Sequence, residues 1–291
     1  MATFPCKRGK CHMAGEQSLS LYYTGEVNPA DLEARELLQV LTAFTRITTK
    51  ASRTYHGSGV KSSIRIQRVQ PGSIDLHWIH EVAASAQSAF PGMPALLLGV
   101  KDIASLVKTW LDLLKFLRGQ PPQKIQNVDN GNALQLENAS GDVTVINGNV
   151  YNTFILNGIG ADAEKLDLPV QHGAKNLELK SQGRRIATYS PADLSNFKPI
   201  RPADKPIESE IDAILEVVAP VLEGEGMWRF KYGRMSLTAK LADEEYRHRV
   251  TEGQESFSHG DRLHAKLKTV QEKLGDKVST RHFVTKVVGR A

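Results

Sequence analysis

The sequence contains few of the features that usually reveal a function. Only two cysteines occur among its 291 residues, and both lie within the first eleven, so a disulfide framework is excluded. The opening residues, MATFPCKRGKCHM, lack the apolar core of a secretory signal. We therefore expect a protein of the cytoplasm.

Long apolar runs are missing as well. One of the two longest uncharged stretches, residues 82–100, is interrupted by Pro91, Gly92, Pro94 and Gly99. A membrane-spanning helix needs about 20 mostly apolar residues, and the prolines and glycines make this stretch a poor candidate for one. The sequence predicts no membrane role.

Signatures of catalysis and of metal binding are absent or incomplete. There is neither a Gly-x-Ser-x-Gly motif nor a phosphate-binding loop that ends in Lys-Ser/Thr. Cys6, Cys11 and His12 offer three potential ligands, whereas a structural zinc site needs four. We interpret residues 1–15 as a flexible basic tail and predict no metal, cofactor or catalytic residue. The alternative left open is a metal site whose ligands come from several copies of the chain in an oligomer.

What the first 120 residues do contain is a succession of apolar patterns. Residues 18–23 alternate as a strand with one buried face, and a helical stripe follows from Leu37 to Ile47. Residues 61–78 predict a hairpin, and residues 95–117 predict a long helix. Together they predict a small α/β sandwich, a domain of residues 16–120.

Residues 121–205 are rich in Asn, Gly and short apolar alternations. Val143 and Val145 share a strand face, and Asn147-Gly148 has the chemistry of a two-residue hairpin turn, after which Val150 would resume the strand. We assign this region to a central hairpin and connector domain. Its end is marked by a proline-rich linker at Pro199, Pro202 and Pro206.

Residues 206–291 offer five short alternating strands and one helix at 242–250, capped by Asp243. Five such strands favour a small, partly closed β-barrel, because closure hides edges that a lone sheet leaves unpaired. The predicted fold class is α+β. It comprises a small N-terminal α/β sandwich, a central hairpin/helix segment and a C-terminal five-stranded barrel.

Four stretches of the sequence are similar to stretches in a known group of proteins: FLRGQPP, NGNVYNTF, WRFKYG and FSHGDRLHAKLKT. In these the chain resembles a group of uncharacterised bacterial proteins that occur in mobile-element or phage-linked gene neighbourhoods. The resemblance implies the α/β front end, the Asn/Gly-rich central hairpin, the small barrel and a bacterial intracellular setting. It brings no catalytic residue with it.

The basic excess is confined to one region. Residues 1–120 carry 14 Lys and Arg against 9 Asp and Glu, whereas the rest of the chain is balanced. This mild excess permits an anionic partner without requiring one. Nucleic-acid binding is therefore one alternative function, with five candidate contact residues: Lys7, Arg8, Lys10, Arg65 and Arg68.

The strand at residues 228–232 alternates aromatic and basic side chains. We expect Trp228, Phe230 and Tyr232 in the barrel core, with the cations on the solvated face. Our leading hypothesis is a non-enzymatic bacterial protein that binds a protein partner through this barrel, as a component of a phage-defence or mobile-element system. The candidate contacts are Arg229, Lys231, Arg234 and Arg247, and a homo-oligomer is left open.

A second alternative is a hydrolase. His259, Asp261 and His264 are close in sequence and offer a base with an orienting acid. Gly260-Asp261 is also ordinary turn chemistry leading into the next strand. We favour the turn, because nothing in the sequence supplies a nucleophile or a metal.

Overall fold

The structure is a computed structural model. It describes residues 17–25, 33–56, 61–70, 73–81, 98–129, 132–201, 206–224, 226–233, 235–258, 260–274 and 277–291, with the backbone alone for the strands at 61–70 and 73–81. The predicted tail and the turn at Pro71-Gly72 lie outside these residues. The fold is α+β, as the sequence predicts.

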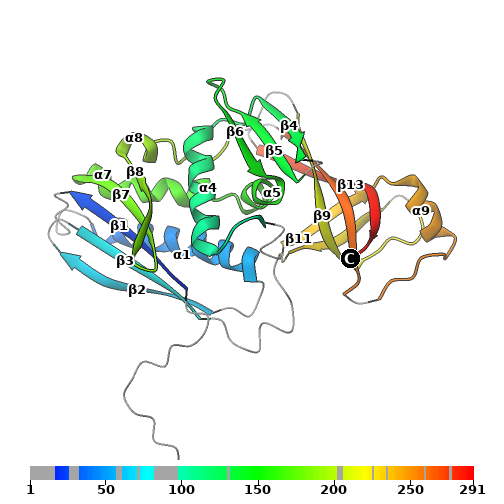
Figure 1. The fold of residues 1–291 in the computed structure, drawn as a ribbon, viewed down its shortest axis with the longest axis horizontal. Coiled ribbons are helices and arrows are strands. Elements are labelled where there is room, and N and C mark those ends of the chain that lie inside the picture. The colour runs from blue at the N-terminus through cyan, green and yellow to red at the C-terminus, as the bar shows by residue number, and fades with distance from the viewer. Residues whose placement is uncertain are drawn as a thin grey trace, which may run out of the picture.

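The front of the molecule is a five-stranded antiparallel sheet covered by two helices (Figure 1). Its strand order is β2 (Lys61–Gln70), β3 (Ser73–Glu81), β1 (Gln17–Gly25), β7 (Ala174–Ser181) and β8 (Arg184–Tyr189). Helices α1 (Ala34–His56) and α4 (Ile103–Leu117) pack on the buried face. Without β8, the chain order is the β-α-β-β-α-β succession of a ferredoxin-like unit, with an insertion between α4 and β7.

Helix α4 is shorter than the apolar run at residues 95–117 predicts. Its N-cap is Asp102, whose side chain accepts a hydrogen bond from the Ser105 amide at 2.7 Å, so the helix begins at Ile103. The expected apolar stripe is confirmed, because Val107, Trp110 and Leu114 are at most 1 % exposed. The helix ends where Arg118 adopts a left-handed conformation with φ 51°.

The insertion contains a second, three-stranded sheet of β4 (Lys124–Val128), β5 (Ala133–Glu137) and β6 (Val143–Asn147). Four short helical segments follow, and these are α5 (Gly148–Asn157), α6 (Gly160–Ala163), the 3-10 helix η2 (Glu164–Asp167) and α7 (Leu168–Gln171). The chain then returns to the front sheet through β7 and β8, and a short helix, α8 (Pro191–Leu194), completes the region.

The predicted hairpin turn at Asn147-Gly148 is wrong. The side-chain oxygen of Asn147 accepts hydrogen bonds from the amides of Asn149 and Val150, at 2.9 and 3.2 Å, and so caps α5. Val150 and Phe154, four residues apart, are both buried on this helix. Asparagine serves equally well in a turn and as an N-cap, and helical spacing after it decides between the two.

The front sheet crosses the boundary expected at residue 120. Strand β7, which lies beyond the insertion, pairs with β1 so that Leu179 is opposite Leu21. Both leucines are fully buried. Residues 174–189 therefore share the sheet of the first 81 residues instead of belonging to a separate connector.

The C-terminal part is a closed five-stranded barrel. Its strands are β9 (Ile207–Ala219), β10 (Met227–Tyr232), β11 (Met235–Leu241), β12 (Arg262–Leu274) and β13 (Lys277–Arg290), in the closed order β10-β11-β13-β12-β9. Closure comes from a short parallel pairing in which Lys240 and Leu241 lie opposite Phe283 and Val284. The predicted barrel is confirmed, and it is closed completely.

Helix α9 (Glu244–Thr251) connects β11 to β12, as the sequence predicts. Asp243 caps it by accepting a hydrogen bond from the Tyr246 amide at 3.1 Å. The same carboxylate accepts from the Val287 amide at 2.8 Å, so this cap also fixes the helix to β13. The side chain of Asp243 is only 5 % exposed, which makes both bonds matter for stability.

The barrel packs against α5 of the insertion. Tyr232 donates a hydrogen bond from its hydroxyl to Asn149, and Ser209 lies 3.5 Å from Asn152 across the same junction. Pro199, expected in a free linker, packs tightly on Gly160. Within the described residues, no helix has the length and apolar character needed to cross a membrane.

Candidate functional site

One surface of the barrel exposes large apolar side chains. Val218 at the end of β9, Leu222 in the loop and Met227 at the start of β10 are 46, 54 and 49 % exposed. Ala219 pairs with Arg229, and the side chain of Val221 lies against Gly226, so this loop is tightly folded back on itself. We call the surface of Val218, Leu222, Met227 and Arg229 the β9–β10 corner.

Strand alternation explains why Met227 and Arg229 point outward. Trp228, Phe230 and Tyr232 alternate with them and are at most 2 % exposed, as the sequence predicts. Trp228 stacks on Phe230 with ring centroids 5.7 Å apart. The aromatic residues of this strand therefore belong to the core and present no open rings for nucleobase stacking.

Val218 is exposed because of a bulge. The register between β9 and β10 passes from Ala219–Arg229 directly to Val217–Phe230, so Val218 has no partner opposite it. Val217 stays in the core at 5 % exposure. Sequence reasoning overlooked this position, although the doubled valine, which breaks the alternation of β9, was the available signal.

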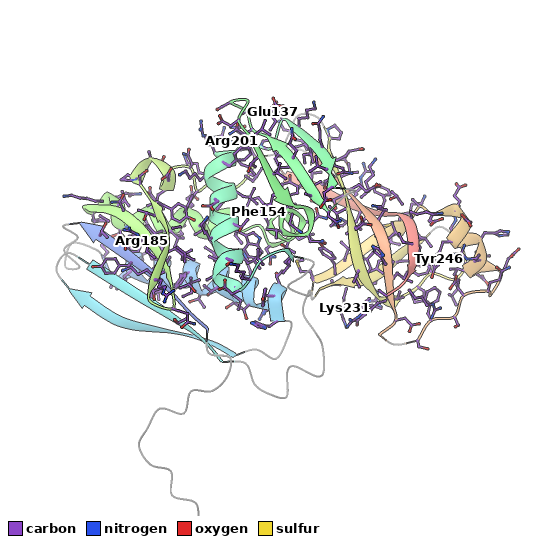
Figure 2. The ribbon with its side chains drawn as sticks, in the orientation of Figure 1. Glu137, Phe154, Arg185, Arg201, Lys231 and Tyr246 are labelled. Carbon is purple, nitrogen blue, oxygen red and sulfur yellow. The ribbon has the colours of Figure 1, made fainter. Side chains whose placement is uncertain are left out.

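The two cations of β10 differ in their surroundings. The ammonium of Lys231, labelled in Figure 2, lies 2.7 Å from the Glu216 carboxylate and is partly buried. Arg229 is exposed and has no ion-pair partner among the residues that the structure describes. Of the two candidate contacts, only Arg229 offers an unneutralised charge to a partner.

A hollow of about 230 Å³ lies beside the corner. It is lined by Glu216, Val217, Val218, Pro220, Lys231, Phe257 and Ser258. Its lining therefore contains both apolar and charged side chains. A hollow of this size can accept one side chain from a partner.

The other two predicted contacts lie elsewhere. Arg247 is on α9, where its guanidinium is 4.0 Å from Glu244. Arg234 lies outside the described residues. The structure therefore brings together Arg229 and Lys231 but does not place the whole predicted set on one surface.

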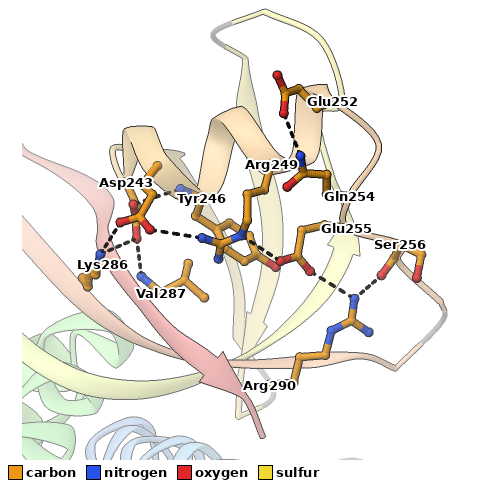
Figure 3. A network of polar contacts seen from close by, with 11 residues as sticks. Asp243, Tyr246, Arg249, Glu252, Gln254, Glu255, Ser256, Lys286, Val287 and Arg290 are labelled. Atoms are coloured by element: carbon orange, nitrogen blue, oxygen red, sulfur yellow. Dashed lines mark hydrogen bonds and ion pairs between the residues drawn. The ribbon is translucent and has the colours of Figure 1, made fainter.

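A polar network ties α9 to the end of the barrel (Figure 3). Arg249 lies 3.2 Å from Glu255, which also pairs with Arg290 at 3.4 Å. Arg290 donates a further hydrogen bond to the backbone oxygen of Ser256. Burial, together with the nearby Glu255 carboxylate, raises the pKa of Tyr246. The charged groups of this network pair with one another, which indicates a structural role, whereas the buried Tyr246 hydroxyl has no hydrogen-bond partner among the described residues.

The predicted hydrolase residues have different partners. Asp261 accepts a hydrogen bond from the Ser258 amide at 2.8 Å and pairs with Arg290 at 3.4 Å. His264 pairs with Asp212 at 3.4 Å. His259 lies outside the described residues. Among the described side chains, no group of three or more His, Cys, Asp and Glu residues is arranged to hold a metal ion.

Charges along the barrel wall are largely neutralised. Asp212 pairs with Lys266 at 2.6 Å, and Glu208 pairs with Lys268 at the same distance. Further along, Arg281 pairs with Glu272 at 2.9 Å. These three ion pairs of the described strands leave less free positive charge for a phosphate backbone.

The candidate nucleic-acid residues are only partly described. Lys7, Arg8 and Lys10 lie outside the described residues. Arg65 and Arg68 occupy β2 at the edge of the front sheet, opposite His77 and Asp75 in the register.

Comparisons with known proteins give no assignment. The chain matches no family model, no curated protein and no solved structure. The chemistry of its surfaces is therefore the basis for a functional conclusion.

Proposed function

We propose that the protein is a non-enzymatic binding protein whose β9–β10 corner docks a protein partner. The observation that carries this proposal is the cluster of exposed Val218, Leu222 and Met227 beside Arg229, which has no ion-pair partner in the described part of the chain. Exposed apolar patches with a polar rim are typical of interaction sites. Methionine and arginine are enriched at such interfaces.

The chemistry of the corner defines the partner. The partner presents apolar side chains to Val218 and Met227, and a carboxylate to the guanidinium of Arg229. Lys231 contributes less, because it is already bound to Glu216. As the cellular setting we propose the one that the sequence resemblance implies, a bacterial phage-defence or mobile-element system.

The test uses the full-length chain. A partner is captured from a bacterial lysate, identified by mass spectrometry, purified and titrated against wild type and the double variant Val218→Glu/Met227→Glu. We expect a loss of affinity of about tenfold or more, since central apolar contacts carry most of the binding energy. The matched control is Val288→Glu, which changes a 57 % exposed valine on β13.

Two outcomes would contradict the proposal. One is equal affinity of wild type and the double variant for the purified partner. The other is a partner that proves to be nucleic acid, detected as binding that is abolished by nuclease and falls steeply with salt. The second outcome would favour the basic front end over the barrel.

A further inference from the structure

A cleft lies where the insertion meets the barrel, and we call it the α5 cleft. Its volume is about 300 Å³, at the lower end of the range for small-molecule sites. Phe154 and Ile155 of α5, Pro199, Ile200 and Ile207 form its apolar part. Figure 2 shows Phe154 between α4 and the barrel, in the interior of the molecule.

The wall of the cleft is held in place from two sides. Gly160 packs so closely on the segment 198–201 that a Cβ atom would lie 2.6 Å from the Cα of Pro199. On the other side, the Arg201 amide donates a hydrogen bond to the Gly119 oxygen at 3.0 Å. The cleft is thus formed before any ligand arrives, which lowers the cost of binding.

The charges at the mouth of the cleft are unequal. Glu272 of β12 lines it, but Arg281 binds this carboxylate at 2.9 Å and neutralises it. Arg201 is exposed at the same cleft and has no ion-pair partner among the described residues. Among the described residues, the guanidinium of Arg201 is therefore the charge without a counter-ion at the mouth, above an apolar interior.

We propose that the α5 cleft binds a small amphipathic carboxylate. The apolar body, of about ten non-hydrogen atoms in this volume, lies among Phe154, Ile155 and Ile207. The carboxylate forms a bidentate pair with the Arg201 guanidinium. Because the lining comes from both the insertion and the barrel, bound ligand stabilises the junction between them.

The test is calorimetric titration of the full-length protein with 3-phenylpropionate and with its neutral amide. We expect saturable binding of the acid in the millimolar range or tighter, and binding of the amide that is about tenfold weaker. Arg201→Gln should reduce the affinity for the acid to that for the amide. Ile155→Trp should fill the cleft and abolish binding of both, with the fold checked by circular dichroism.

The matched control is Arg184→Gln, which removes an exposed arginine from β8 of the front sheet and should leave both affinities unchanged. Absence of saturable binding by wild type would overturn the proposal. So would equal affinity for acid and amide, or an Arg201→Gln variant that binds the acid as wild type does. None of these results bears on the β9–β10 corner, so this proposal and the proposed protein docking can fail separately.

Discussion

The front sheet and the barrel differ in how far apart in the chain their neighbouring strands lie. The barrel uses one continuous stretch, residues 207–290, whereas the front sheet pairs β1 with β7 across about 150 positions. The barrel can therefore form from its own sequence, but the front sheet requires the insertion to fold back first. The contrast predicts that the two regions are separable in their folding although they share a packed junction.

The largest expected effect comes from the barrel core. Phe230 is fully buried, so Phe230→Ala should lower the free energy of unfolding by about 3–5 kcal/mol. If the regions are separable, the barrel will become protease-sensitive while β1, β3 and β7 stay protected in hydrogen exchange. Simultaneous loss of protection in both regions would break the comparison.

Gly160→Ala tests the opposite side of the junction. Its new Cβ would meet backbone atoms of Lys198 and Pro199 that cannot yield easily, so we expect a loss of about 3 kcal/mol in chemical denaturation. The control is Gly289→Ala, at a strand position with no atom within 4 Å. A change in the control as large as that of Gly160→Ala would argue against a tightly packed wall.

Acid should destabilise the barrel through His282, and burial also lowers the pKa of His56 on α1, the helix that covers the front sheet. Burial lowers the pKa of His282 from 6.5 to about 4, and Thr269 lies 3.1 Å from its ring nitrogen. Between these two values the unfolded chain binds a proton that the folded barrel does not, so stability falls as the pH falls. The expected loss is about 2 kcal/mol.

His282→Asn is the variant that isolates this effect, because it keeps a polar partner for Thr269 and cannot titrate. Its free energy of unfolding should change less between pH 6.5 and 4 than that of wild type. An identical pH slope in wild type and variant would show that another group controls acid sensitivity.

The smallest effect is expected from the single hydrogen bond between the barrel and α5. Tyr232→Phe removes the hydrogen bond to Asn149 and should cost about 1 kcal/mol. A double-mutant cycle with Asn149→Ala measures the coupling between insertion and barrel directly. A coupling energy near zero would support the contrast between the front sheet and the barrel, since it would show that the insertion and the barrel are energetically independent.

Local patterns were sufficient to predict the barrel and helices α1, α4 and α9 from sequence. Alternation along β10 identified Trp228, Phe230 and Tyr232 as core residues, and Asp243 was recognised as the cap of α9. The pairing of β7 with β1 could not be predicted, because the residues around Leu21 and Leu179 do not indicate that these two leucines lie opposite each other. Asn147 was misassigned because its chemistry suits both a turn and a helix cap.

The candidate sites were harder to predict than the fold. Arg229 was identified from its strand, but its apolar neighbours Val218 and Met227 become a patch only through the bulge and the loop. Arg201 was not identified at all, since the α5 cleft is formed by segments that meet only in three dimensions. The periodicity of a sequence does not predict a surface that is formed by segments far apart in the chain.

The parallel pairing of β11 with β13 determines when the barrel can close during synthesis. Ribosomes add about 5–20 residues per second, and roughly 50 residues separate the end of β11 from the end of β13. For several seconds the nascent β9, β10 and β11 would expose the aromatic face of Trp228, Phe230 and Tyr232 to solvent. A chaperone that shields this emerging hairpin would act in that interval, before the last strand seals it.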